Sequence, residues 1–178
     1  MRRGLALIFS MTMIFVCAVG CSSQKDGIEI KDGQFAATSS EIVEFLNKQI
    51  DPEDIDQLPD RFKIKDEKNE RTETLDLKKT TEINFIVDKE SGYVKRIEFV
   101  AFNISDSIKE AVKQLIYYAG LASSQLNPEE DTDKLRKEND FSHINEYKTD
   151  VYEDDQMKYE LMTGANGYLK FTMTPVKK

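Results

Sequence analysis

Seven segments of this chain alternate apolar and polar side chains with a period of two, and this alternation restricts its fold most. Ile83, Phe85 and Val87, for example, all fall on one face of an extended strand. Alternation of this kind is typical of half-buried strands, which pack one face on a core and expose the other to water. The predicted strands are residues 62–65, 74–77, 82–87, 93–102, 146–152, 157–162 and 168–174.

Helices are predicted before and between these strands. Thr38 to Glu41 has the S/T-x-x-E form of a capping box, and the apolar run that follows it ends at Asp51-Pro52. A second helix is predicted over 107–119, where apolar residues recur at steps of three and four; a stop at Gly120 and a continuation to Ser123 are the alternatives for its end. A third, on the surface, is predicted after Asn127-Pro128. The chain is therefore expected to be an α+β protein, with an antiparallel sheet of about seven strands and helices packed on one face.

A short repeat suggests a tandem duplication of a helix-plus-strands unit. Residues 84–95 align without a gap on residues 159–170, and both segments end in Gly-Tyr-(Val/Leu)-Lys. The alignment predicts half-repeats 35–103 and 104–178 that share one core, because half of this chain buries little surface alone. Chance recurrence in a chain rich in hairpins is the alternative. The element order over 35–176 resembles the tandem fold of β-lactamase inhibitory protein and related small envelope lipoproteins, which implies protein binding or envelope assembly.

The first 21 residues have the composition of a secretory signal. Two arginines precede an uncharged apolar run, and small residues and Cys21 follow it. The run is shorter than the roughly 20 residues that a spanning helix needs. Ala18-Val19-Gly20-Cys21 resembles the lipobox of bacterial lipoproteins, although that family prefers Leu at the position of Ala18. A signal peptide cut elsewhere and an uncleaved anchor are the alternatives.

The lipobox resemblance implies a division of the chain and a location. Residues 1–20 would be cleaved, residues 21–34 would form a lipidated tether, and residues 35–178 would form a single domain. Acyl chains such as palmitate on Cys21 would hold the domain at the extracytoplasmic face of the cell membrane, or at the outer membrane if the source has one. A single acyl chain binds only marginally, whereas two or three hold a protein durably.

Composition argues against several classes of function. The formal net charge of −8 disfavours binding to nucleic acid or to an anionic membrane surface. No P-loop, G-x-G-x-x-G motif or nucleophile elbow occurs. His143 is the single histidine, and a zinc site usually needs three or four ligands. Acidic clusters at 53–56, 129–133 and 153–155 lack the EF-hand pattern, so no metal or cofactor is expected, and weak calcium binding is the alternative.

Tyr168 and Lys170 are the candidate contact residues. They alternate with Leu169 and Phe171 on the last predicted strand, so they are expected on its solvent-facing side. The sequence thus predicts a lipid-anchored module that binds an envelope or secreted protein and has no enzymatic chemistry. The alternatives are an envelope hydrolase that acts on wall polymer and a ligand-binding lipoprotein.

Substitution of the lipobox cysteine tests the anchor. In Cys21→Ser, we expect labelled palmitate to be absent from the protein and a larger, unprocessed precursor to accumulate, because the acylated sulfur is gone. Radiolabelling and gel electrophoresis measure both effects. Cys17→Ser, inside the segment to be removed, should be labelled and processed normally. Unchanged palmitate incorporation in Cys21→Ser would contradict the lipoprotein interpretation.

Overall fold

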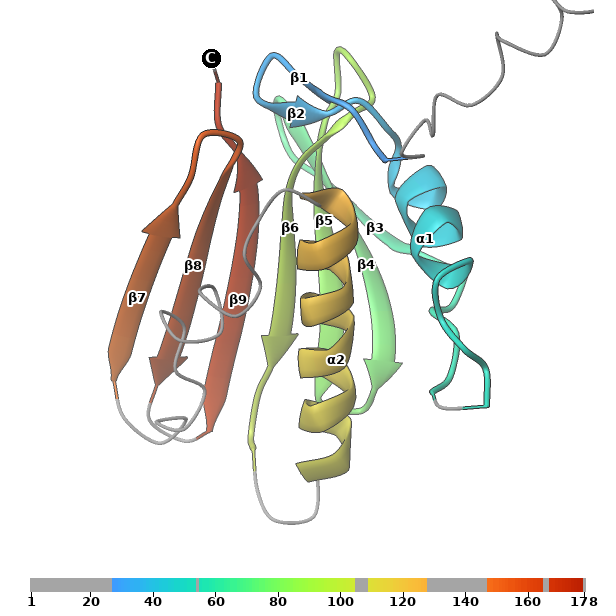
Figure 1. The fold of residues 1–178 in the computed structure, drawn as a ribbon, viewed down its shortest axis with the longest axis vertical. Coiled ribbons are helices and arrows are strands. Elements are labelled where there is room, and N and C mark those ends of the chain that lie inside the picture. Colours follow the sequence, from blue (N-terminus) through green and yellow to red (C-terminus); the bar gives the residue numbers. More distant parts are fainter. Residues whose placement is uncertain (1–26, 54, 105–108, 128–146, 165–166, 178) are drawn as a thin grey trace, which may run out of the picture.

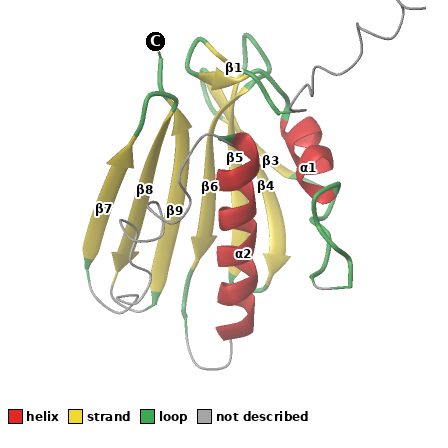
Figure 2. Cartoon of the chain, in the orientation of Figure 1, coloured by secondary structure: helices red, strands yellow, loops and turns green. Residues whose placement is uncertain are grey.

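A nine-stranded antiparallel sheet and two helices make up the described part of the chain, in a computed structural model (Figure 1, Figure 2). The structure describes residues 27–53, 55–104, 109–127, 147–164 and 167–177. The predicted α+β class is confirmed, with seven strands in one continuous path and two further short strands beside it. His143 and the helix predicted after Asn127-Pro128 lie outside the described residues.

Seven strands form two meanders that join edge to edge. Their bounds are β3 (Lys63–Asp66), β4 (Glu70–Lys78), β5 (Thr81–Asp88), β6 (Val94–Ala101), β7 (Lys148–Glu153), β8 (Met157–Gly164) and β9 (Tyr168–Pro175). The order across the sheet is β3-β4-β5-β6-β9-β8-β7. Strand β9, the last of the described strands, therefore lies beside β6 and joins the second meander to the first.

Two short strands extend the sheet before its first helix. Strand β1 (Ile30–Lys31) pairs with β2 (Gln34–Phe35), and Phe35 pairs with Val94 at the start of β6. Asp32 and Gly33 between them have positive φ angles of 53° and 73°, as a tight two-residue hairpin requires. Part of segment 21–34 thus belongs to the sheet. A strand of two residues is too short to show an alternation of apolar and polar side chains in the sequence.

Helix α1 (Ser39–Asn47) begins at the predicted capping box. The Thr38 amide donates to Glu41 Oε2 at 2.8 Å, and the Glu41 amide donates to Thr38 Oγ1 at 3.3 Å. These hydrogen bonds, chiefly the one from the backbone, lower the pKa of the Glu41 carboxyl. The helix ends at Asn47, before the predicted stop at Asp51-Pro52. The Asn47 side chain bonds to the following loop: its Oδ1 atom accepts from the Leu58 backbone N–H at 2.7 Å, and its Nδ2 atom donates to the Leu58 carbonyl at 2.9 Å.

Helix α2 (Lys109–Leu126) packs across β5 and β6 and forms the centre of the core (Figure 1). Its buried stripe includes Val112, Leu115 and Ala119, at the predicted steps of three and four. The helix continues to Leu126, beyond the stop at Gly120 and the continuation to Ser123 that the sequence allows, so that Ala122 and Leu126 are also buried. Helix α1 contacts α2 and is not clearly packed on a face of the sheet, so the prediction of helices packed on one face holds for α2 alone.

A row of aromatic rings connects the two meanders inside the core. Phe99 of β6 lies opposite Phe171 of β9, with ring centroids 6.2 Å apart. Tyr159 of β8 stacks on Phe171 at 6.1 Å, and Tyr152 of β7 stacks on Tyr159 at the same distance. Aromatic pairs at such separations stabilise a fold beyond their buried area, by about 0.5–1.5 kcal/mol each. The row therefore fixes β7–β9 against β6.

The repeated Gly-Tyr motif occupies similar turns in the two meanders. Gly92 and Gly167 precede β6 and β9 with φ angles of 75° and 65°. The longer gapless alignment pairs side chains on different faces, since buried Phe85 of β5 aligns with Glu160, whose β8 neighbours Tyr159 and Leu161 are buried. The geometric correspondence is therefore clearest at the turn, and the half-repeats stay a prediction.

Alanine at the two motif glycines should separate backbone strain from crowding. Both positions have a left-handed φ, which costs a residue with a side chain roughly 1–2 kcal/mol. A Cβ at Gly92 would meet nothing within 4 Å, whereas a Cβ at Gly167 would lie 2.5 Å from the backbone N and O of Ile104. We expect Gly167→Ala to lose about 1–3 kcal/mol more than Gly92→Ala through overpacking, measured by urea unfolding. Equal losses would contradict the close approach of residue 104 to this turn.

Candidate binding surface

The side of the sheet opposite α2, here called the outer face, carries both candidate contact residues. Buried Leu169, Phe171 and Met173 point from β9 into the core. Tyr168 and Lys170 alternate with them and are only half-buried. The strand register thus places both residues on the solvent-facing side, where the alternation of the sequence puts them.

A polar row crosses the outer face from strand to strand. Its members are cross-strand partners on five adjacent strands: Thr74, Asn84, Glu98, Thr172 and Glu160. Thr74 Oγ1 donates to Asn84 Oδ1 at 2.6 Å, and the Asn84 amide donates to Glu82 Oε1 at 3.0 Å. The first of these bonds joins β4 to β5, and the second orders the Asn84 side chain along β5.

Glu98 is the electrostatic centre of this row. Its Oε1 atom accepts from Arg96 Nε at 2.9 Å and lies 3.7 Å from Lys170 Nζ, and its side chain is only 14% exposed. A carboxylate that is largely withdrawn from water needs such partners. Lys170 therefore helps to neutralise Glu98, and its ammonium group is held at a defined place on the outer face.

Tyr168 lies close to the same charges. Burial raises the pKa of its phenol above the ordinary value, and the negative charges of Glu98 and Glu82 raise it further, because they disfavour a phenolate. Tyr168 is therefore a neutral hydroxyl at physiological pH, available to donate or accept a hydrogen bond. The structure brings the two predicted contact residues together around Glu98.

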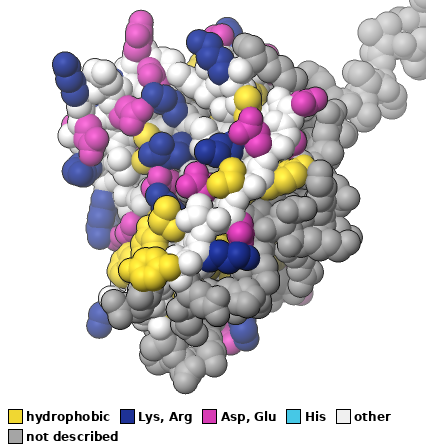
Figure 3. All heavy atoms as spheres, turned by 90° about the vertical axis from the view of Figure 1, so that its left-hand side faces the viewer, with side chains coloured by type: hydrophobic (Ala, Val, Ile, Leu, Met, Phe, Trp, Pro, Cys, Tyr) yellow, Lys and Arg dark blue, Asp and Glu magenta, His cyan; other side chains and the backbone are white. Residues whose placement is uncertain are grey.

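An apolar patch borders this polar region on β7–β9. We call Tyr147, Val151, Met162 and Tyr168 the tyrosine patch; Tyr147 is 84% exposed and Val151 is 56% exposed. A Cβ at Gly164 would lie 3.5 Å from both Tyr147 Cε1 and Tyr168 Cβ. The two tyrosine side chains therefore both approach the backbone of this glycine. The view onto β7 shows apolar side chains gathered amid charged ones (Figure 3).

Tyr147 and Val151 were not singled out from the sequence, although they fall on one face of the strand predicted over 146–152. The signal was available in the alternation of Tyr147, Thr149 and Val151 with charged neighbours. The alternation does not indicate which strand pairs with this segment. Only the β7–β8 register, which sets Lys148 opposite Thr163, places Tyr147 over Gly164.

Asp54 and the acidic cluster at 129–133 are not described by the structure, and the rest of the three acidic clusters lies within the described residues. No group of three His, Cys, Asp or Glu side chains there could hold an ion. Asp154 acts instead in a turn, where Oδ1 accepts from the amides of Gln156 at 2.6 Å and Met157 at 2.7 Å. Its Oδ2 atom accepts from the Asn127 amide at 2.7 Å, which ties the β7–β8 turn to the end of α2.

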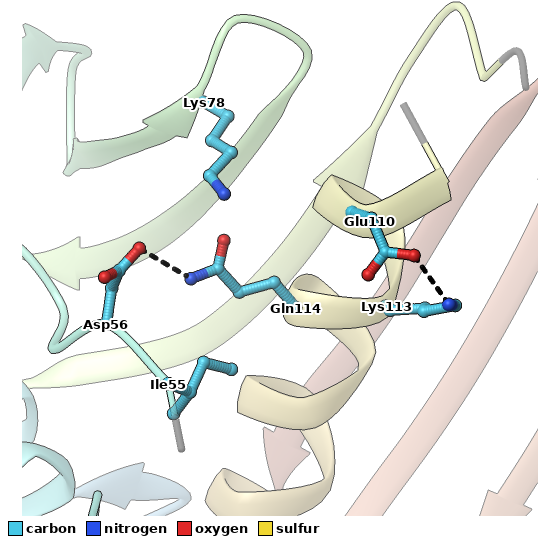
Figure 4. A pocket seen from close by; sticks show the side chains of 6 residues that line it. All are labelled: Ile55, Asp56, Lys78, Glu110, Lys113 and Gln114. Carbon is cyan, nitrogen blue, oxygen red and sulfur yellow. Dashed lines mark hydrogen bonds and ion pairs between the residues drawn. The ribbon is translucent and has the colours of Figure 1, made fainter. Parts of the chain in front are cut away.

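A hollow of about 340 Å³ lies between α2 and the loop before β3 (Figure 4). Gln114 Nε2 donates to Asp56 Oδ2 at 3.4 Å and to Tyr118 Oη at 3.0 Å, while Tyr118 Oη donates to the Asp56 carbonyl at 2.6 Å. These bonds hold the loop on the helix. Among the described residues, the lining contains no His or Cys that could act with a carboxylate as base and nucleophile; the described lining is Ile55, Asp56, Lys78, Glu110, Lys113 and Gln114.

Comparison with protein-family models, curated proteins and solved structures finds no match. Within the described ranges, no helix has the length and apolar character needed to cross a membrane.

Removal of the Glu98 charge should lower the pKa of Tyr168 toward its ordinary value, because a carboxylate next to the phenol disfavours phenolate formation. NMR titration of isotope-labelled tyrosine in the Glu98→Gln protein measures the change. Glu160→Gln, on the same polar row, is the matched control and should leave Tyr168 unchanged. Identical titration of Tyr168 with and without the Glu98 charge would overturn the proposed electrostatic coupling.

Proposed function

We propose that this chain is a lipid-anchored lipoprotein of the cell envelope that binds another protein through the outer face of its sheet. The observation that carries this proposal is the tyrosine patch beside the fixed charges around Glu98. Contiguous apolar patches on a solvent-exposed protein surface often mark interaction sites. Tyrosine is common at such interfaces because its ring buries apolar area while its hydroxyl bonds to a polar group.

The outer face is suited to binding because its polar groups are already ordered. Arg96, Glu98 and Lys170 hold one another in place, so little side-chain entropy is lost when a partner covers them. Tyr147 and Val151 supply apolar area that water now covers. A partner with an apolar centre and a rim of both charges would fit this surface, and an envelope or secreted protein is the proposed class.

Lipidation of Cys21 and duplication of a helix-plus-strands unit complete the proposal. Lipid on Cys21 would tether the domain through a short polar segment and leave the outer face free. Helix α2 on the sheet and the Gly-Tyr turns at Gly92 and Gly167 support a duplicated unit of the kind found in β-lactamase inhibitory protein and its lipoprotein relatives. In this proposal the domain acts by contact, without enzymatic chemistry.

Capture of partners from native membranes tests the outer face. The full chain with an affinity tag is cross-linked in its own membranes, and recovered proteins are quantified for the parent and for Tyr168→Ala, Lys170→Ala. We expect the double variant to lose about tenfold or more of its main partner, because truncation of anchor residues each costs more than about 1 kcal/mol. Circular dichroism should show an unchanged fold.

A matched double variant away from the outer face provides the control. Ile64→Ala, at a residue that pairs with core-side Glu73, combined with Lys113→Ala on α2 likewise removes one apolar side chain and one lysine, and it should recover the partner as the parent does. Equal capture by both double variants would contradict binding through the outer face. Loss of the cellular phenotype in a folded His143→Ala protein, with capture intact, would favour the hydrolase.

A further inference from the structure

The hollow between α2 and the loop before β3 contains two polar groups that lack partners among the described residues (Figure 4). The Oε1 atom of Gln114 is buried and accepts no hydrogen bond from them. Lys78, at the end of β4, points into the same hollow, and its ammonium group has no ion pair or hydrogen bond to a described residue. A buried acceptor without a donor is destabilising, because it has lost its bonds to water. The hollow therefore offers one acceptor and one donor to a ligand.

The hydrogen bonds around Gln114 fix which end of its amide group faces the hollow. Tyr118 Oη donates its hydrogen to the Asp56 carbonyl at 2.6 Å, so its oxygen accepts from Gln114 Nε2 at 3.0 Å. The Asp56 carboxylate also needs a donor, and Gln114 Nε2 lies 3.4 Å from its Oδ2 atom. Rotation of the amide by half a turn would set oxygen against oxygen at both contacts. Nε2 therefore serves the loop, and Oε1 is left for the hollow.

The charges of the described lining cancel but are separated in space. Lys78 and Lys113 carry two positive charges, and Asp56 and Glu110 carry two negative charges. Lys113 Nζ and Glu110 Oε1 lie 2.6 Å apart and neutralise each other. The remaining pair, Lys78 and Asp56, lies on two sides of the Gln114 amide (Figure 4). An ammonium group and a carboxylate are thus presented to two different ends of one small molecule.

This arrangement disfavours simple ions. A metal cation would meet the Lys78 ammonium group, and an anion such as phosphate would meet the Asp56 carboxylate. A molecule that carries both charges pairs with both groups, and its N–H hydrogens supply the donor that Gln114 Oε1 lacks. The volume of about 340 Å³ is at the lower end of the range for ligand pockets. Ile55 is the one apolar residue of the described lining, so charge would select the ligand more than apolar contact.

We propose that this hollow binds a free α-amino acid. Its carboxylate contacts the Lys78 ammonium group, and its α-ammonium group donates to Gln114 Oε1 and to the Asp56 carboxylate. Binding is weak, because Lys78 and Asp56 are both exposed to water, which screens their charges. The bound molecule bridges the loop, the end of β4 and α2, and so stabilises their packing. The site lies on the α2 side of the sheet and does not depend on the protein partner proposed for the outer face.

Three small probes separate the two charges of the ligand. Glycine carries both, methylamine carries only the ammonium group, and acetate carries only the carboxylate. The full chain in deuterated detergent micelles is titrated with each probe, and binding is measured by NMR saturation transfer to the carbon-bound hydrogens of the probe. We expect glycine to bind at least about tenfold more tightly than either fragment. Binding of one fragment as tight as that of glycine, or no binding of glycine, would overturn the proposal.

Neutral variants test where glycine binds. Lys78→Met and Asp56→Asn each remove one charge with little change of shape, and each should weaken glycine binding about tenfold. Lys79→Met in the same turn and Asp60→Asn in the same loop lie outside the described lining and are the matched controls, which should bind glycine as the parent does. Circular dichroism should show one fold for all four. Equal glycine binding by site variants and controls would overturn the proposal. Capture of the protein partner is a separate measurement, so either proposal can fail alone.

Discussion

The pairing of β6 with β9 is the contact on which the rest of this structure depends. It joins two meanders that would each present an open apolar edge, and it aligns Phe99 with Phe171 in the core. Tyr159 and Tyr152 continue this row to the end strand β7. Without the row, β7–β9 would have no fixed position relative to the strands under α2, and the tyrosine patch would not border the charges of β6.

The same pairing builds the outer face from residues that are distant in sequence. Glu98 comes from the first meander and Lys170 from the second, and they meet because Glu98 pairs with Thr172, two residues beyond Lys170 on the same face. The single register of β6 and β9 therefore determines both which side chains enter the core and which lie on the outer face. A slip of one residue would expose the aromatic row and bury the charges together. Packing inside the sheet thus specifies the arrangement of the surface on which binding is proposed.

The period of two predicted the seven main strands and the faces of Tyr168 and Lys170, because alternation is a local property of each strand. The capping box at Thr38 was equally local and is confirmed. Strand order could not be predicted, since nothing within β9 indicates that it lies beside β6. The two-residue strands β1 and β2 were too short to show a period, and α1 ends at Asn47, whose side chain bonds to Leu58 in the following loop. The approach of Tyr147 and Tyr168 to Gly164 likewise depends on which strands are neighbours.

The order of the sheet has a consequence for how the chain reaches this state. Strands β3 to β6 pair with their neighbours in sequence and can form as soon as they are synthesised, whereas β9 is the last strand to appear. Until then the β6 edge and the aromatic ring of Phe99 lack their final partners. Long-range strand pairing raises the contact order and slows folding, and open apolar edges invite aggregation. Holding the chain unfolded until its C-terminal hairpin is available would therefore benefit this topology.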